Sequence, residues 1–171
     1  SKNLKTVTVP ESLESISITT FKESSVYTNP QNWEEDVFYV GDCLVEVDWE
    51  SKAENIVIRE GTRKIEAYAF SWCDNVKSIT IPDSVVVIGA QAFANCSSLE
   101  KIYIGSGVED ISGSPFYYEI EGIPCSQLKN IEVSKDNKYF TSVDGVLFSK
   151  DMTRLIQYPY GKTQKEYTVP D

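Results

Sequence analysis

SITIPDSVVVIGAQAFANCSSLEKIY, residues 78–103, holds one complete turn of a repeat that organises most of this chain. Isoleucine recurs every 23 residues at Ile56, Ile79 and Ile102. Three further series keep the same step, namely Ile58, Ile81 and Ile104, then Ile65, Ile88 and Ile111, then Phe70, Phe93 and Phe116. A fixed period of about 20 to 50 residues is typical of solenoids, in which each unit buries its apolar face only by stacking on its neighbours. We therefore expect regular stacked coils over residues 56–133.

Within one repeat, the alternation of Ile79 and Ile81 predicts a short strand with both side chains turned inward. Pro82 is expected to end this strand, because proline cannot donate a hydrogen bond to a strand ladder, and Asp83 and Ser84 favour a turn. Strands of successive coils would then pair in parallel, about 4.8 Å apart. The predicted fold is mostly β with short helical turns, a right-handed solenoid with a parallel strand ladder.

The N-terminal part carries a looser copy of the repeat. A step of 72 residues places Val7 and Val9 on Ile79 and Ile81, so the alternating residues 4–18 are predicted to contain strands. After a polar stretch over residues 19–36, Val37–Trp49 is expected to form two strands joined by a tight turn at Gly41 and Asp42.

The C-terminal part holds a longer coil. Tyr167–Pro170 repeats the pattern of Ile79–Pro82, which indicates a truncated repeat or a closing strand. We expect one domain over residues 1–171, with irregular coils and a hairpin in residues 1–55, regular repeats in 56–133, and a long coil with a closing strand in 134–171.

Composition excludes several classes of function. Sixteen Lys and Arg against 26 Asp and Glu give a formal net charge of −10, which disfavours nucleic acid as a partner. The chain has no histidine, which removes histidine-activated nucleophiles and imidazole metal sites, and no calcium-loop motif is present, so we expect no metal and no cofactor. No apolar run approaches the roughly 18 residues of a membrane span, so we expect no membrane insertion by this segment, and Ser1–Asn3 does not open like a signal peptide.

The order Ala-Phe-x-x-Cys-x-x-Leu-x-x-Ile-x-Ile resembles the BspA-like class of bacterial cell-surface leucine-rich repeats. The resemblance covers Cys73–Val133 and extends more loosely to both ends. The departures are Val76 in place of leucine, Ser114–Phe116 in place of Ala-Phe, and a six-residue insertion near Tyr117–Ile123, after which the spacing to the next coil grows from 23 to 29. Such a family implies a secreted or surface-displayed protein that binds other macromolecules through its repeat faces and performs no chemistry.

Three of the four cysteines, Cys73, Cys96 and Cys125, recur at one position of the repeat. That recurrence indicates a ladder of buried free thiols rather than disulfides or metal ligands.

Two surfaces are candidate binding sites. Between the inward residues of the strands lie Val57, Thr80, Tyr103, Glu132 and Thr168, with Ser78, Lys101 and Asn130 beside them. These side chains are expected to align across the coils, either as a plain solvated face or as a recognition surface, for which tyrosine and charged neighbours are suited. Tyr117 and Tyr118 in the insertion form the second candidate. Trp72 is expected to serve packing or edge protection or, with its ring facing outward, to join a contact site.

Three functions remain open from the sequence. The first is an extracellular, non-enzymatic module that binds a protein or surface glycan through the strand face and the inserted loop. The second is a structural spacer within a longer repeat array. The third is a glycan hydrolase, which would need two carboxylates roughly 5 to 9.5 Å apart, with Glu109 and Asp110, or Glu119 and Glu121, as the available clusters.

Overall fold

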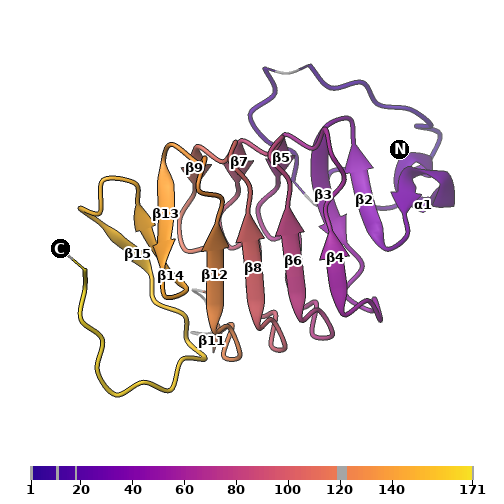
Figure 1. Ribbon diagram of the computed structural model, residues 1–171. Helices are drawn as coiled ribbons and strands as arrows, with labels where there is room; N and C mark the ends of the chain where they lie inside the picture. Colours follow the sequence, from indigo (N-terminus) through magenta and orange to yellow (C-terminus); the bar gives the residue numbers. More distant parts are fainter. Residues whose placement is uncertain (1, 11, 18, 119–122, 171) are drawn as a thin grey trace.

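The protein is a stack of coils, seen in a computed structural model that describes residues 2–10, 12–17, 19–118 and 123–170 (Figure 1). Its front sheet contains four parallel strands in the order β12-β8-β6-β4, with one strand from each coil. These strands are β4 (Asn55–Val57), β6 (Ser78–Ile81), β8 (Lys101–Ile104) and β12 (Asn130–Val133). The expected solenoid with a parallel strand ladder is confirmed.

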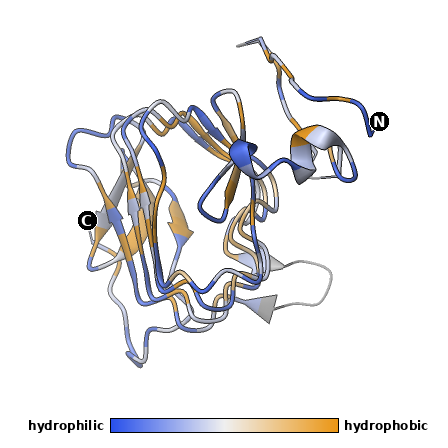
Figure 2. Cartoon of the chain, turned by 90° about the vertical axis from the view of Figure 1, so that its right-hand side faces the viewer, coloured by the Kyte–Doolittle hydropathy of each residue, from blue (hydrophilic) through white to orange (hydrophobic). Residues whose placement is uncertain are grey.

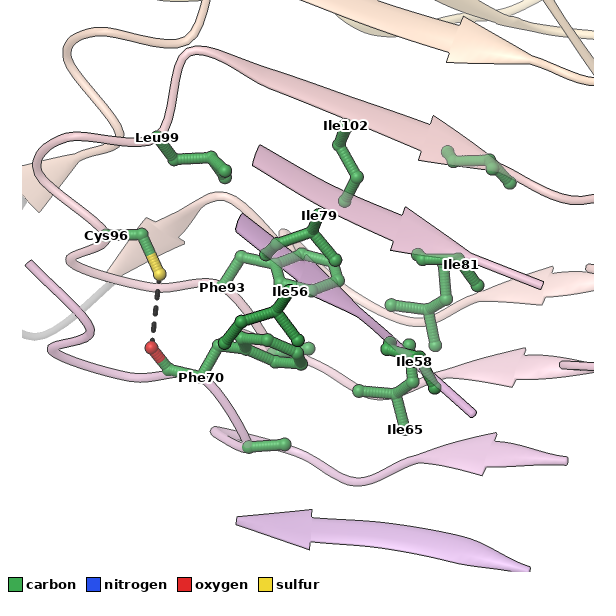
Figure 3. Close-up of a cluster of buried hydrophobic side chains, with 14 of the residues drawn as sticks. Ile56, Ile58, Ile65, Phe70, Ile79, Ile81, Phe93, Cys96, Leu99 and Ile102 are labelled. Carbon is green, nitrogen blue, oxygen red and sulfur yellow. Dashed lines mark hydrogen bonds between the residues drawn. The ribbon is translucent and has the colours of Figure 1, made fainter. Parts of the chain in front are cut away.

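Residues 23 positions apart in the sequence pair with one another on adjacent strands of the front sheet. Ile79 pairs with Ile56 on one side and with Ile102 on the other, and their side chains are buried. Phe93, which is fully buried, lies between two phenylalanines of the adjacent coils, with ring centroids 5.3 Å from Phe70 and 5.4 Å from Phe116. Figure 3 shows Ile56, Ile79 and Ile102 together with Phe70 and Phe93 in one buried cluster. Each coil is thus completed by its neighbours, as the period predicts.

A rear sheet of six short strands closes the opposite wall of the stack, in the order β1-β2-β3-β5-β7-β9. Its members are β1 (Trp33–Glu34), β2 (Val37–Val40), β3 (Cys43–Val47), β5 (Lys64–Ile65), β7 (Val87–Ile88) and β9 (Asp110–Ile111). The predicted hairpin is confirmed: Val40 pairs with Cys43 across a two-residue turn in which Gly41 has a φ of +62°. Strand β3 pairs in parallel with β5, so the hairpin is joined to the regular repeats.

The remaining elements lie at the ends of the stack and at the insertion. They are α1 (Ser25–Thr28), the 3-10 turn η1 (Pro30–Asn32), β10 (Tyr117–Tyr118), β11 (Ile123–Pro124), β13 (Phe140–Val143), β14 (Val146–Ser149) and β15 (Leu155–Gln157). Strands β13, β14 and β15 form an antiparallel sheet beside β12, where the Ile131 amide donates to the Gly145 carbonyl at 3.0 Å. The Val133 amide donates to Ser142 Oγ at 3.1 Å. This sheet therefore covers the C-terminal edge of the front sheet.

The expectation of strands in residues 4–18 is wrong for the residues described there. Val7, Val9 and Ile16 pack instead on the outward face of the β2–β3 hairpin, against buried side chains that include Phe38 and Val45. In Figure 2 the N-terminal segment lies outside the superposed coils. The reason is that the hairpin is apolar on both faces, and its outward face needs a cover that the regular coils do not provide.

The closing strand expected at Tyr167–Pro170 is likewise not formed. Thr168 is exposed and Val169 is 50% exposed, so neither joins the front sheet. The edge of β12 that would pair with this segment is already occupied by Gly145 and Ser142. Thr168 is therefore not part of the strand face.

Candidate functional site

The strand face is the outward surface of the front sheet. Parallel pairing aligns one residue from each strand into a row, in which Val57 lies opposite Thr80, Thr80 opposite Tyr103, and Tyr103 opposite Glu132. Because side chains alternate along a strand, this row faces solvent while the isoleucines on either side face the core. The row that the sequence predicts is thus formed, without Thr168.

A second row lies two residues earlier along each strand. It contains Asn55, Ser78, Lys101 and Asn130, again in register. Ser78 Oγ lies 2.5 Å from Asn55 Oδ1, and Asn130 Nδ2 donates to Glu132 Oε1 at 2.6 Å. The Asn130 contact links the two rows and restrains the Glu132 carboxylate on the face.

A pocket of about 210 Å³ lies between these rows. Its lining includes Ser78, Thr80, Lys101, Tyr103 and Glu132. Tyr103 is 37% exposed. Lys101, two residues before it in β8, and Glu132, opposite it in β12, are also exposed. The structure therefore brings together five of the residues singled out in the sequence, Ser78, Thr80, Lys101, Tyr103 and Glu132. A phenol ring flanked by one cation and one carboxylate can make an apolar contact and two charge-assisted hydrogen bonds to one partner.

A row of alternating charge borders the strand face, and it was missed in the sequence. It consists of Glu54, Lys77, Glu100 and Lys129, each of which immediately precedes a member of the second row in the sequence. Lys77 Nζ lies 2.7 Å from Glu54 Oε1, and this hydrogen bond raises the pKa of the exposed Lys77 ammonium. The signal was available, because Glu54, Lys77 and Glu100 follow the same 23-residue step with alternating sign.

The insertion and Trp72 lie apart from this pocket. The Tyr117 ring stacks on Tyr160, with ring centroids 6.2 Å apart and planes inclined by 24°. The side chain of Tyr118 lies outside the part of the molecule that is described. Trp72 is 45% exposed in the turn between Phe70 and Cys73, as expected, but it does not line the pocket. The candidate residues therefore form separate surfaces rather than one site.

Of the two carboxylate clusters, Glu109 and Asp110 lie among the described residues. Asp110 lies in β9 of the rear sheet, where its Oδ2 accepts a hydrogen bond from Ser112 Oγ at 2.7 Å. Glu119 and Glu121 lie outside the described residues. Among the residues with described placement, no three acidic, cysteine or histidine side chains are grouped to hold a metal ion.

All four cysteines are free and buried. Cys96 Sγ donates to the Phe70 carbonyl at 3.1 Å (Figure 3), and Cys125 Sγ donates to the Phe93 carbonyl at 2.9 Å. Burial, together with the nearby Asp48, raises the pKa of the Cys73 thiol to about 12. The neighbouring Cys125 thiol and burial raise the pKa of the Cys96 thiol. The prediction of a buried thiol ladder is confirmed, and these thiols link successive coils.

Over the described ranges, the molecule contains no helix with the length and apolar character that crossing a bilayer requires.

Comparison with known proteins places these observations in a family. A family model described as BspA type Leucine rich repeat region matches residues 48–164, in six copies. Among solved structures, the pneumococcal vaccine antigen PcpA shares 31% sequence identity over 70% of this chain and 35% of that chain, with a TM-score of 0.48. The chain thus spans about a third of that antigen's chain.

Two further structures are similar at lower identity. A leucine-rich repeat protein from Bacteroides capillosus shares 24% identity over 60% of this chain and 85% of that chain, with a TM-score of 0.46. A leucine rich cell surface protein from Faecalibacterium prausnitzii shares 24% identity over 54% of this chain and 35% of that chain, with a TM-score of 0.35. Comparison with curated proteins gives no match.

Proposed function

Because this chain belongs to the BspA-type leucine-rich-repeat family, we propose that it is a non-enzymatic module that binds another protein through the strand face. The observation that carries the proposal is the alignment of Thr80, Tyr103 and Glu132 across three coils, with Lys101 beside them and a pocket between. An exposed tyrosine at the centre of a rigid sheet offers contact area at a low entropic cost. The charged neighbours would fix the orientation of the partner.

The rigidity of the face supports binding rather than conformational gating. The strands beneath the pocket are anchored by fully or almost fully buried side chains, including Ile79, Ile102 and Ile131. Such a platform pre-orders its surface residues, which lowers the entropic cost of forming a complex. The module is proposed to act outside the cell or at its surface, as the resemblance to cell-surface repeats implies.

The test is capture on immobilised protein followed by substitution in a matched pair. Tyr103→Ala removes the centre of the strand face, whereas Tyr68→Ala removes a tyrosine of nearly the same exposure, 36% against 37%, from the turn after β5. Proteins captured from bacterial surface extracts and from host matrix extracts would be identified and their affinities measured. We expect Tyr103→Ala to lower the affinity for the captured protein by about 30-fold, the effect of losing a central tyrosine in an interface.

The control outcome decides between the surfaces. Equal binding by Tyr103→Ala and the unchanged chain, with loss in Tyr68→Ala, would place the binding surface elsewhere. Selective binding to a panel of surface glycans, with no protein captured, would replace the protein partner by a carbohydrate.

A further inference from the structure

Strand β4 forms an open edge of the front sheet, at the opposite end from β12. Its only strand partner in the described part of the chain is β6. On the β6 side, the Glu54 carbonyl accepts from the Ser78 amide and the Ile58 amide donates to the Thr80 carbonyl, both at 3.0 Å. Because successive residues of a strand direct their backbone groups to opposite edges, Asn55 and Val57 present their N–H and C=O groups to the open side.

A pocket of about 370 Å³ lies along this open edge (β4 is labelled in Figure 1). Its apolar lining includes Val37, Ala53 and Ile56, and its rim includes the Val57 side chain, which is 74% exposed. A strand placed beside β4 would therefore find backbone partners on one side and an apolar floor beneath. The Val57 side chain would become the next member of its row on the strand face.

The rim that β1 and the β1–β2 turn contribute to this pocket is acidic. Glu34, Glu35 and Asp36 line it together with a single cation, Arg59, which gives three carboxylates against one guanidinium. Arg59 is already engaged: it pairs with Glu34, donates to the Gly41 carbonyl at 2.6 Å, and stacks 4.0 Å over the Tyr39 ring. The charge that remains on the rim is negative, so a cationic side chain is the complementary group.

From these features we propose that the β4 edge binds an extended, lysine- or arginine-bearing segment of a partner protein as an added strand. This surface differs from the pocket around Tyr103, and the proposal does not depend on that pocket. A second copy of the chain is a poor occupant for two reasons. Head-to-tail stacking would need the edge of β12, which Gly145 and Ser142 occupy. Pairing of two β4 edges would oppose two acidic rims on chains of net charge −10.

The probe is a fluorescein-labelled decapeptide of alternating lysine and valine, with the matched glutamate and valine peptide as its control. Binding would be measured by fluorescence anisotropy. The decisive variant is Val57→Pro, because it removes an N–H from the open edge without removing a donor to β6. Val57→Thr keeps that N–H and serves as the matched control. Glu35→Lys tests the rim.

We expect the lysine peptide to bind and the glutamate peptide not to bind. Val57→Pro should lower the affinity for the lysine peptide about tenfold, the effect of losing one backbone hydrogen bond and its neighbouring contact. Val57→Thr should bind as the unchanged chain does, and Glu35→Lys should weaken binding by about twofold to fivefold. If Val57→Pro does not fold, hydrogen exchange on the unchanged chain replaces it, with peptide-dependent protection expected at the amides of Asn55 and Val57.

Two results would overturn the proposal. Equal binding to folded Val57→Pro, or no protection of the Asn55 and Val57 amides, would mean that the peptide is held by charge alone. Concentration-dependent self-association in sedimentation velocity that Val57→Pro abolishes would show that a second copy occupies the edge.

Discussion

Replacing Asn137 by alanine should destabilise the protein far more than its position in a loop suggests. The Asn137 side chain is 1% exposed. Its Nδ2 donates to the carbonyls of Gly105 and Val108 at 2.9 and 3.0 Å, and its Oδ1 accepts from the amides of Tyr139 and Phe140 at 2.8 Å each. This single side chain therefore joins the turn after β8 to the start of β13.

The expected loss follows from the number of contacts. Four hydrogen bonds at about 1 kcal/mol each give about 4 kcal/mol, because the buried carbonyls and the Phe140 amide would be left without partners. A domain of this kind has a total free energy of unfolding of about 5 to 15 kcal/mol, so the loss is a large share of it. Part of it will be recovered where water reaches Tyr139, which is 46% exposed.

The matched control is Asn75→Ala. Asn75 is exposed, and its Nδ2 donates to one carbonyl, that of Ser51, at 2.8 Å. Urea unfolding of both variants, followed by circular dichroism and tryptophan fluorescence, would give the difference in free energy of unfolding. We expect a loss of about 1 kcal/mol or less for Asn75→Ala. If the two variants differ by less than about 1 kcal/mol, Asn137 does not join the two segments in the way described.

Two further predictions concern the core. Phe93→Ala removes the central ring between Phe70 and Phe116 and should lower the free energy of unfolding by about 3 to 5 kcal/mol in the same urea assay; a loss below about 1 kcal/mol would contradict the stacked core. The pKa of Cys73 is raised from 9.0 to about 12, so the folded state keeps a proton that the unfolded state loses, and stability should fall as pH rises from about 9 toward 12. Urea unfolding at about pH 8 and about pH 10 measures this fall in the free energy of unfolding, which should be smaller for Cys73→Ala than for the unchanged chain. An equal fall in the two proteins would count against this assignment.

The strand face could be predicted from the sequence because two local rules fix it. Alternation along the strand determines that Thr80 and Tyr103 face outward while the isoleucines face the core. The 23-residue step determines that the two residues lie in register on adjacent strands. Glu132 followed from the same rules once the six-residue insertion was counted. The thiol ladder was predictable for the same reason.

The ends of the chain could not be predicted in this way. Residues 4–17 have the alternation of a strand, yet Val7 and Val9 cover the β2–β3 hairpin, because its outward face is apolar. Tyr167–Pro170 has the sequence of a front-sheet strand but forms none, because β12 already pairs with the C-terminal sheet. A repeat pattern indicates which residues can form a coil. It does not indicate which edge of a sheet is free to pair with them.

The sequence by itself determined the solenoid, the side of each strand that faces solvent, and the alignment of Thr80, Tyr103 and Glu132, because periodic apolar residues act within and between adjacent coils. Only the tertiary structure decided that Lys101 and Tyr103 share a pocket apart from Tyr117 and Trp72, that β12 is covered, and that β4 remains open. Those outcomes depend on packing between segments far apart in the chain, where the apolar area of one segment competes with that of another for the same surface.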